Sequence, residues 1–193
     1  MSKFSILTSL LAVTLLFQAC SKEDKSHDTT NKANQEANAL LATNQFVLKS
    51  LDNKEYIIEK KADGFALKGA KGKVIILDVF ATWCPPCQAE ASHLASLQKK
   101  YKNDLKVIGI TVEENIPNTK LENFRKQFRA TYTLVNSSEN MRLINEIAAK
   151  LKIGRNFGIP LMALYKDGKL VNFYQGATEE EFIESDIKKA LGK

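Results

Sequence analysis

The pattern of hydrophobic and polar positions divides the chain into an apolar N-terminal run, a polar stretch, and a region from about residue 45 onward that alternates between strand-like and helix-like patterns. Continuous or alternating apolar runs predict strands, and apolar positions three or four residues apart predict helices. The expected strands lie at 46–51, 55–58, 73–80, 105–111, 132–135, 161–165 and 170–174, and the expected helices lie at about 85–101, 121–128, 141–151 and 178–191.

The order of these elements predicts the fold class. Asp52-Asn53 and Asp167-Gly168 are turn signals that join neighbouring strands into hairpins. Residues 73–80 form a continuous apolar run, typical of a central strand buried on both faces, and Asp78 is the charge that interrupts it. Strand, helix, strand and helix, followed by a closing hairpin and helix, predict an α/β fold: a three-layer sandwich around a mixed sheet.

The N-terminus has the features of an export signal. A basic start at Lys3 precedes an apolar run from Ile6 to Phe17, which is shorter than the roughly 20 residues that a membrane-spanning helix needs. The segment L-F-Q-A-C, which ends at Cys20, resembles a bacterial lipobox, although its phenylalanine departs from the usual aliphatic residue. We therefore expect a signal peptide over 1–19 and a lipidated Cys20 that anchors the protein to a membrane in the periplasm. The alternative is an ordinary signal peptide with Cys20 as a leftover thiol.

Residues 20–44 are rich in polar side chains and predict a flexible tether, with a folded domain over 45–193. The full chain has 193 residues, of which 44% are hydrophobic and 26% are charged, so it has room for a packed core. Its net charge of +6 is spread along the sequence and is not interleaved with aromatic residues. This pattern argues against nucleic-acid binding.

The segment D-V-F-A-T-W-C-P-P-C contains Cys84 and Cys87, which could bind metal, close a structural disulfide or exchange electrons. A metal site needs further ligands, and Cys20, His27 and His93 are poorly placed to supply them. A disulfide that closes so short a loop adds little stability, which leaves redox chemistry.

The predicted position of the pair supports redox chemistry. Cys84 should precede the first turn of a helix, where free N–H groups and the helix dipole stabilise a thiolate. A thiolate at Cys84 would be the attacking nucleophile and the better leaving group. Cys87 should lie one turn further in, more deeply buried, and would resolve the mixed disulfide.

In this setting the chain resembles the thioredoxin superfamily. The resemblance rests on the W-C-P-P-C motif between a strand and a helix and on G-I-P, which occurs more than 70 residues later before a terminal hairpin. Within the superfamily, the lipoprotein-like start, the N-terminal hairpin and an extra helix-strand segment near 117–136 resemble the TlpA/ResA-like membrane-tethered thiol–disulfide oxidoreductases. The resemblance covers about residues 45–191.

The resemblance implies roles for individual residues. Trp83 matches the tryptophan beside the redox pair, and it is otherwise a plain hydrophobic cover. Pro160 matches the cis-proline that faces the disulfide and keeps metal away, and Ile159 offers its backbone to a substrate. We expect the substrate to contact the following residues: Trp83, Pro85, Pro86, Ile159 and Pro160. The expected cofactor is none beyond the Cys84–Cys87 disulfide.

Two acidic residues are candidates for proton transfer. Asp78 matches thioredoxin's buried aspartate, and desolvation should raise its pKa and suit it to exchange a proton with Cys87. The alternative is a strand-end aspartate bonded to the backbone. Glu90 matches a glutamate that is frequent after C-P-P-C in this branch, and it could equally be a first-turn residue favoured by the helix dipole.

The chain departs from the family beside Pro160. Leu161 replaces the usual threonine, and the segment K-I-G-R-N-F-G-I-P is a few residues longer than usual. The expected loop at Arg155, Asn156 and Phe157 could therefore lie beside Cys84 and help to select the partner.

The resemblance implies a reductase of protein disulfides. Relatives keep apocytochrome c cysteines reduced with electrons from a membrane donor of the DsbD/CcdA type. The alternatives are a disulfide oxidase or isomerase for exported proteins and a non-enzymatic lipoprotein that binds partners. A peroxidase is disfavoured because A-T-W-C lacks the surround of a peroxidatic cysteine. We expect a monomer.

Overall fold

The computed structural model describes residues 44–193, and the expected signal peptide, Cys20 and almost all of the expected tether lie outside this region. The elements in chain order are β1 (Gln45–Lys49), β2 (Glu55–Lys61), β3 (Gly64–Leu67), β4 (Val74–Phe80), α2 (Pro85–Lys100), β5 (Leu105–Thr111), α3 (Asn118–Gln127), β6 (Thr133–Val135), α4 (Asn140–Lys150), β7 (Leu161–Lys166), β8 (Lys169–Gln175) and α5 (Glu180–Leu191). Among these helices, none combines the length and the apolar character needed to cross a membrane.

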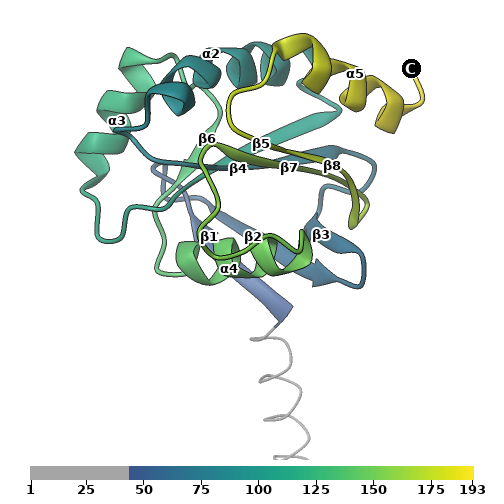
Figure 1. The fold of residues 1–193 in the computed structure, drawn as a ribbon, viewed down its shortest axis with the longest axis horizontal. Helices are drawn as coiled ribbons and strands as arrows, with labels where there is room; N and C mark the ends of the chain where they lie inside the picture. The colour runs from purple at the N-terminus through teal and green to yellow at the C-terminus, as the bar shows by residue number, and fades with distance from the viewer. Residues whose placement is uncertain (1–43) are drawn as a thin grey trace, which may run out of the picture. The chain divides into compact units, whose positions relative to one another are not determined.

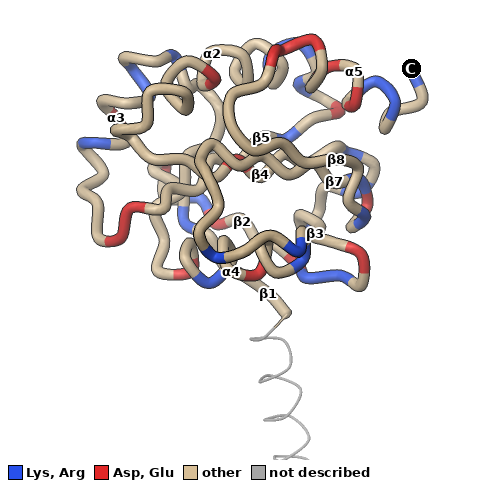
Figure 2. Tube along the Cα trace, viewed as in Figure 1, with Lys and Arg blue, Asp and Glu red and all other residues tan. Residues whose placement is uncertain are grey.

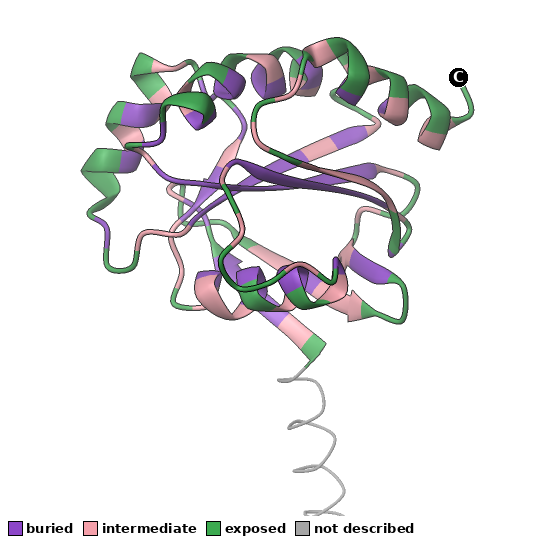
Figure 3. Cartoon of the chain, in the orientation of Figure 1, coloured by how far each residue is buried: buried purple, intermediate pink, exposed green. Residues whose placement is uncertain are grey.

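Five strands form the central sheet in the order β6-β5-β4-β7-β8. Strands β4, β5 and β6 are parallel, whereas β7 is antiparallel to β4 and β8 is antiparallel to β7. The sheet is therefore mixed, as predicted. All residues of β4 are buried, which confirms a central strand covered on both faces (Figure 3).

Helices cover both faces of this sheet (Figure 1). Helices α2, α3 and α5 lie on one face, and α4 lies on the other together with a second sheet. Because side chains alternate along a strand, Val74 and Ile76 pack under α2 and α5, whereas Ile75 and Leu77 pack against α4. The same alternation places Asp78 on the α2 side. The predicted three-layer α/β/α fold and its helix-strand insertion, formed by α3 and β6, are confirmed.

The N-terminal part of the fold differs from the expected hairpin. Strands β1 and β2 pair antiparallel as predicted, but β3 pairs with β2 and completes a separate three-stranded sheet. The pattern of Gly64 to Leu67 does not reveal this strand, because the segment is short and has no β-branched residue. Phe65 of this strand contacts Phe46 and Tyr165 in the core on the α4 side of the central sheet.

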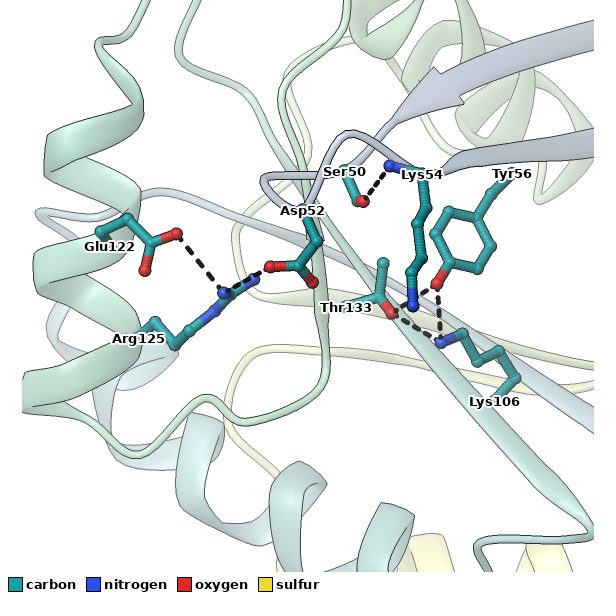
Figure 4. A network of polar contacts seen from close by, with 8 residues as sticks. All are labelled: Ser50, Asp52, Lys54, Tyr56, Lys106, Glu122, Arg125 and Thr133. Atoms are coloured by element: carbon teal, nitrogen blue, oxygen red, sulfur yellow. Dashed lines mark hydrogen bonds and ion pairs between the residues drawn. The ribbon is translucent and has the colours of Figure 1, made fainter.

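Polar contacts join the first hairpin to the central sheet and to α3 (Figure 4). Lys106 of β5 lies 4.7 Å from the ring centroid of Tyr56 in β2 and donates to Thr133 Oγ1 at 2.6 Å. Nη1 of Arg125 in α3 lies 3.4 Å from Oδ1 of Asp52, which is in the turn after β1. Along the tube of the described residues, Lys and Arg positions are interspersed with Asp and Glu positions (Figure 2).

Candidate functional site

Cys84 and Cys87 form a disulfide at the N-terminus of α2, with their Cα atoms 5.3 Å apart. Cys84 is the N-cap residue in extended conformation, and Pro85 begins the helix, where a missing N–H costs little. The backbone N–H of Cys87 donates to Cys84 Sγ at 3.3 Å. The predicted position of Cys84 at the helix start is confirmed, and there the N–H groups and dipole favour a thiolate after reduction.

The expectation that Cys87 is the more buried cysteine is wrong for the disulfide form. Each cysteine is 3% exposed. Both cysteines belong to the core cluster on the α2 side of the central sheet, together with Ala81 and Ala91. Any difference in reactivity between the cysteines must therefore come from their hydrogen bonds and helix position rather than from bulk burial.

The bond between Ile159 and Pro160 is cis, as predicted, and it lies against the disulfide. Cys84 Sγ is 3.7 Å from the Ile159 carbonyl oxygen, although 75 positions separate the two residues. Pro160 is buried and directly precedes β7, so the central sheet holds this peptide in place. The two segments that the sequence singled out thus meet at one site.

The side chains around Cys84 face solvent. Trp83 is 65% exposed, and Pro85 and Pro86 are also exposed. Together with the half-buried Ile159, they surround a cysteine that is almost covered. The indole of Trp83 is therefore open to contact with another molecule, and it is not enclosed by the fold.

A clamp that the sequence did not reveal holds the segment before Cys84. Glu113, just after β5, accepts hydrogen bonds from the Thr82 backbone N–H at 2.6 Å and from Thr82 Oγ1 at 3.0 Å. Thr111 Oγ1 lies 3.3 Å from the same carboxylate. These contacts tie the end of β4 to the end of β5. No local pattern predicts them, because Thr82 and Glu113 are 31 positions apart.

Asp78 is buried on the α2 side of the sheet and is 3% exposed. Its Oδ2 accepts a hydrogen bond from Tyr132 Oη at 3.1 Å, so the alternative of a strand-end aspartate bonded to the backbone is not what the structure shows. Burial raises the pKa of Asp78 to about 7, against the opposing effect of the Tyr132 hydrogen bond. Sequence reasoning identified Asp78 and missed Tyr132, which it assigned only to a short strand.

Glu90 lies in the second turn of α2 and is 2% exposed, so its interpretation as a first-turn residue favoured by the helix dipole is wrong. Its Oε1 accepts a hydrogen bond from the Thr178 backbone N–H at 3.2 Å, and Oε2 is buried without a hydrogen-bond partner among residues 44–193. Burial and the nearby charge of Asp78 raise the pKa of Glu90 to about 8. Two buried carboxyl groups thus lie on the α2 side of the central sheet, and the charge of Asp78 disfavours the ionisation of Glu90.

The loop between α4 and β7 contains the three residues proposed to select partners. Arg155 and Asn156 are exposed. Phe157 is half-buried and, like Ile159, packs against the core on the α4 side of the central sheet. Within residues 44–193, no group of three or more His, Cys, Asp or Glu side chains is arranged to hold a metal ion.

Residues 53–191 match the profile of the Redoxin family, and this segment includes the cysteine pair, both acids and Pro160. The chain belongs to the Redoxin family. Among curated proteins, this redoxin is 29% identical over 128 residues to the thiol-disulfide oxidoreductase ResA of Bacillus thuringiensis subsp. konkukian. That match covers 64% of this chain and 66% of ResA, just under two thirds of the relative. It is also 39% identical over 72 residues to the thioredoxin-like protein YneN of Bacillus subtilis, a match that covers 36% of this chain and 39% of YneN.

Solved structures confirm a thioredoxin-like fold for this redoxin. A thiol:disulfide interchange protein of the thioredoxin family from Chlorobium tepidum superposes with a TM-score of 0.58 at 23% identity, over 77% of this chain and 94% of that one. StoA from Bacillus subtilis superposes with a TM-score of 0.52 at 20% identity, over 74% of this chain and 95% of that one. At these identities the similarity concerns the fold.

Proposed function

We propose that this redoxin is an extracytoplasmic thiol–disulfide oxidoreductase that reduces disulfides in other proteins through Cys84 and Cys87. The observation that carries the proposal is the meeting of Cys84, at the N-terminus of α2, with the Ile159 carbonyl that precedes cis-Pro160, where Sγ and O are 3.7 Å apart. A backbone carbonyl beside a reactive sulfur can pair with the backbone of an extended substrate segment. The relative ResA is named a thiol-disulfide oxidoreductase, which supports the same class of activity for this redoxin.

The reaction begins with the reduced pair. The Cys84 thiolate, stabilised by the Cys87 N–H and the helix dipole, attacks one sulfur of a substrate disulfide and releases the other as a thiolate. Cys87 then loses its proton and attacks Cys84 Sγ. The Cys84–Cys87 disulfide forms, the second substrate sulfur leaves as a thiolate, and two electrons have passed to the substrate.

Asp78 is the proposed acceptor of the Cys87 proton. A carboxyl group whose pKa is about 7 can both take up and return a proton near neutral pH. Glu90, three residues after Cys87 on the same helix, keeps a second carboxyl group on this side of the core. The exposed Trp83, Pro85 and Pro86 would contact the incoming polypeptide, as would Ile159 and Pro160.

The proposal extends to location and partners. Cys20 would carry a lipid anchor, and residues up to 44 would tether the redoxin domain on the periplasmic side of a membrane. Apocytochrome c is the proposed substrate, and a membrane protein of the DsbD/CcdA type is the proposed electron donor. An oxidase or isomerase role for exported proteins is the alternative within the same chemistry.

The reduction potential of the Cys84–Cys87 pair tests the direction of electron flow. Equilibration with glutathione should give a value close to that of thioredoxin, about −270 mV, whereas a value close to that of DsbA, about −120 mV, would favour the oxidase. A Cys87→Ala variant cannot resolve the mixed disulfide and should trap substrates on Cys84. A Cys84→Ala variant is the matched control, and equal trapping by both variants would refute Cys84 as the nucleophile.

A further inference from the structure

The side chain of Tyr132 extends over strand β5 of the central sheet to reach Asp78. Tyr132 directly precedes β6, Asp78 lies in β4, and β5 runs between these two strands. The hydrogen bond from Tyr132 Oη to Asp78 Oδ2 measures 3.1 Å and joins residues that are 54 positions apart. The ring therefore spans the full width of β5.

Gly109 in β5 is what allows this crossing. Gly109 is the Cα partner of Asp78 on one side and of Leu134 on the other. A Cβ atom at this position would lie 3.0 Å from Tyr132 Cε2 and 2.8 Å from Leu134 Cδ2, which is closer than packed atoms tolerate without a shift. Because glycine has no side chain, the phenol ring lies in the space that a larger residue would fill.

The groups that surround the pair include one further buried carboxyl group, that of Glu90. Tyr132 is 3% exposed and lies in the same core cluster as Cys84 and Cys87. From α2, the titratable groups on this side are Glu90 and the two cysteines, and from the α5 end the contact is the Thr178 N–H on Glu90. The strands on either side of Asp78 place Gly109 and Met162 opposite it, and neither residue carries a charge.

We infer that Tyr132 is a positioning residue of the redox reaction, which holds one oxygen of Asp78 and thereby sets the pH at which that carboxylate accepts the proton of Cys87. The inference rests on the proposed function, because it requires Asp78 to exchange a proton with Cys87. In that exchange the Cys87 S–H bond breaks and a carboxyl O–H bond forms on Asp78. The new thiolate then attacks Cys84 Sγ and displaces the substrate thiolate.

The direction of the effect follows from the hydrogen bond. A donor that points at a carboxylate stabilises its ionised form, so the Tyr132 contact lowers the pKa of Asp78 while burial raises it. Burial and the charge of Asp78 hold the pKa of Tyr132 well above its usual value of 10, so the phenol stays a donor at physiological pH. Without this donor, Asp78 would hold its proton to higher pH and would be a poorer acceptor at neutrality.

A Tyr132→Phe variant, which keeps the ring and removes the donor, tests the inference. Carboxyl-carbon NMR of the reduced protein follows the ionisation of Asp78 and Glu90 directly. Rapid mixing of the reduced protein with an aromatic disulfide that releases a coloured thiolate gives two phases: attack by Cys84, and resolution by Cys87. In Tyr132→Phe, the midpoint of Asp78 and the midpoint of the resolution phase should both move up by about half a unit to one unit. The attack phase should change less.

Two further variants sharpen this test. Tyr101→Phe removes a comparable phenol–carboxylate hydrogen bond, which joins the end of α2 to Glu184 in α5 at 2.6 Å, and it should leave both midpoints in place. Gly109→Ala keeps the hydroxyl, and its methyl group presses on Leu134 Cδ2 and on Tyr132 Cε2, so the ring should move by a few tenths of an ångström and the Asp78 midpoint should move up by less than in Tyr132→Phe. It also provides a second route to the result if Tyr132→Phe folds poorly.

The outcomes separate the inference from the function on which it rests. An unchanged Asp78 midpoint in Tyr132→Phe overturns the inference, whatever the kinetics show. A shifted Asp78 midpoint with an unchanged resolution profile instead overturns the proton transfer assigned to Asp78, and Asp78→Asn should then also resolve normally. A shift of the same size in Tyr101→Phe would show that the effect is a general response of the fold and would overturn the inference as well.

Discussion

Cys84 and Cys87 have the same exposed fraction but different surroundings, and these surroundings determine their proposed roles. Cys84 caps the helix, receives the Cys87 N–H and lies beside the Ile159 carbonyl. Cys87 lies inside the first turn, on the same helix as Glu90. The site therefore separates a sulfur that meets the partner from a sulfur that depends on internal proton transfer.

Replacement of Asp78 by Asn should change how stability depends on pH. The unfolded chain loses the Asp78 proton near pH 3.8, whereas the folded protein keeps it to about pH 7. Between these values the folded state binds more protons, so rising pH destabilises the wild type, by an amount on the order of a few kcal/mol. Asp78→Asn removes this contribution, and asparagine can still accept from Tyr132. Urea unfolding should show the variant gaining stability relative to wild type from pH 4 to pH 7, and parallel curves would contradict the buried, protonated state of Asp78.

At the scale of the elements, the site depends on segments that join different strands. The Glu113 carboxylate ties the loop after β4 to the end of β5 through Thr82, directly before Trp83 and Cys84. The cis peptide at Pro160 is held by the start of β7. The reacting sulfur is thus positioned by the carboxyl ends of two parallel strands and by the amino end of a third.

A Glu113→Ala variant should loosen the loop that carries Trp83. The change removes both hydrogen bonds to Thr82, and we expect a loss of about 1 kcal/mol in the free energy of unfolding, because the carboxylate is half-buried and partly screened. Trp83 is the single tryptophan of the chain, so its fluorescence anisotropy reports on the loop and should fall. Glu114→Ala changes the exposed neighbour and should leave both measurements unchanged. Equal anisotropy in the two variants would argue against the clamp.

The loop before Pro160 should influence the choice of partner. Removal of residues 155–157 takes away two exposed side chains and the half-buried Phe157. We expect the set of proteins trapped by Cys87→Ala to change, while turnover of a small disulfide stays within about twofold, because Cys84 and α2 are untouched. An unchanged set of trapped proteins would refute a selective role for this loop.

At the scale of the whole folded region, the second sheet closes the face of the central sheet that α4 leaves open. Phe65 in β3 packs edge-on against Tyr165 in β7, with ring centroids 5.5 Å apart. Tyr165 is almost fully buried, and its ring lies against Gly64. The second sheet thus packs against the central strands on the α4 side, which is the face opposite to the redox site.

A Gly64→Ala variant should test this packing. The added Cβ would lie 2.7 Å from Tyr165 Cδ1, so the ring or β3 must shift, and the free energy of unfolding should fall by about 1–3 kcal/mol. Gly154→Ala adds the same methyl group where no atom lies within 4 Å and should change stability by less than about 0.5 kcal/mol. Urea unfolding of both variants gives the comparison, and equal stabilities would show that β3 packs loosely.

The sequence by itself determined the features that depend on local patterns. Apolar periodicity located the helices α2 to α5 and most strands of the described region, because burial repeats along the chain with the period of each element. The spacing of Cys84 and Cys87 after a buried strand indicated redox chemistry. Asp78 became a candidate because its charge interrupts that apolar strand. The third strand of the first sheet was missed because it is short and has little β-branched character.

The tertiary structure decided the features that depend on residues far apart in the chain. The contact of Cys84 with Ile159, the clamp between Thr82 and Glu113, and the hydrogen bond from Tyr132 to Asp78 span 75, 31 and 54 positions, respectively. No local pattern encodes such pairs, because they arise only when strand order and register bring the segments together. The role of Gly109 also became visible only in the folded sheet, because the Tyr132 ring that lies over it comes from another strand segment.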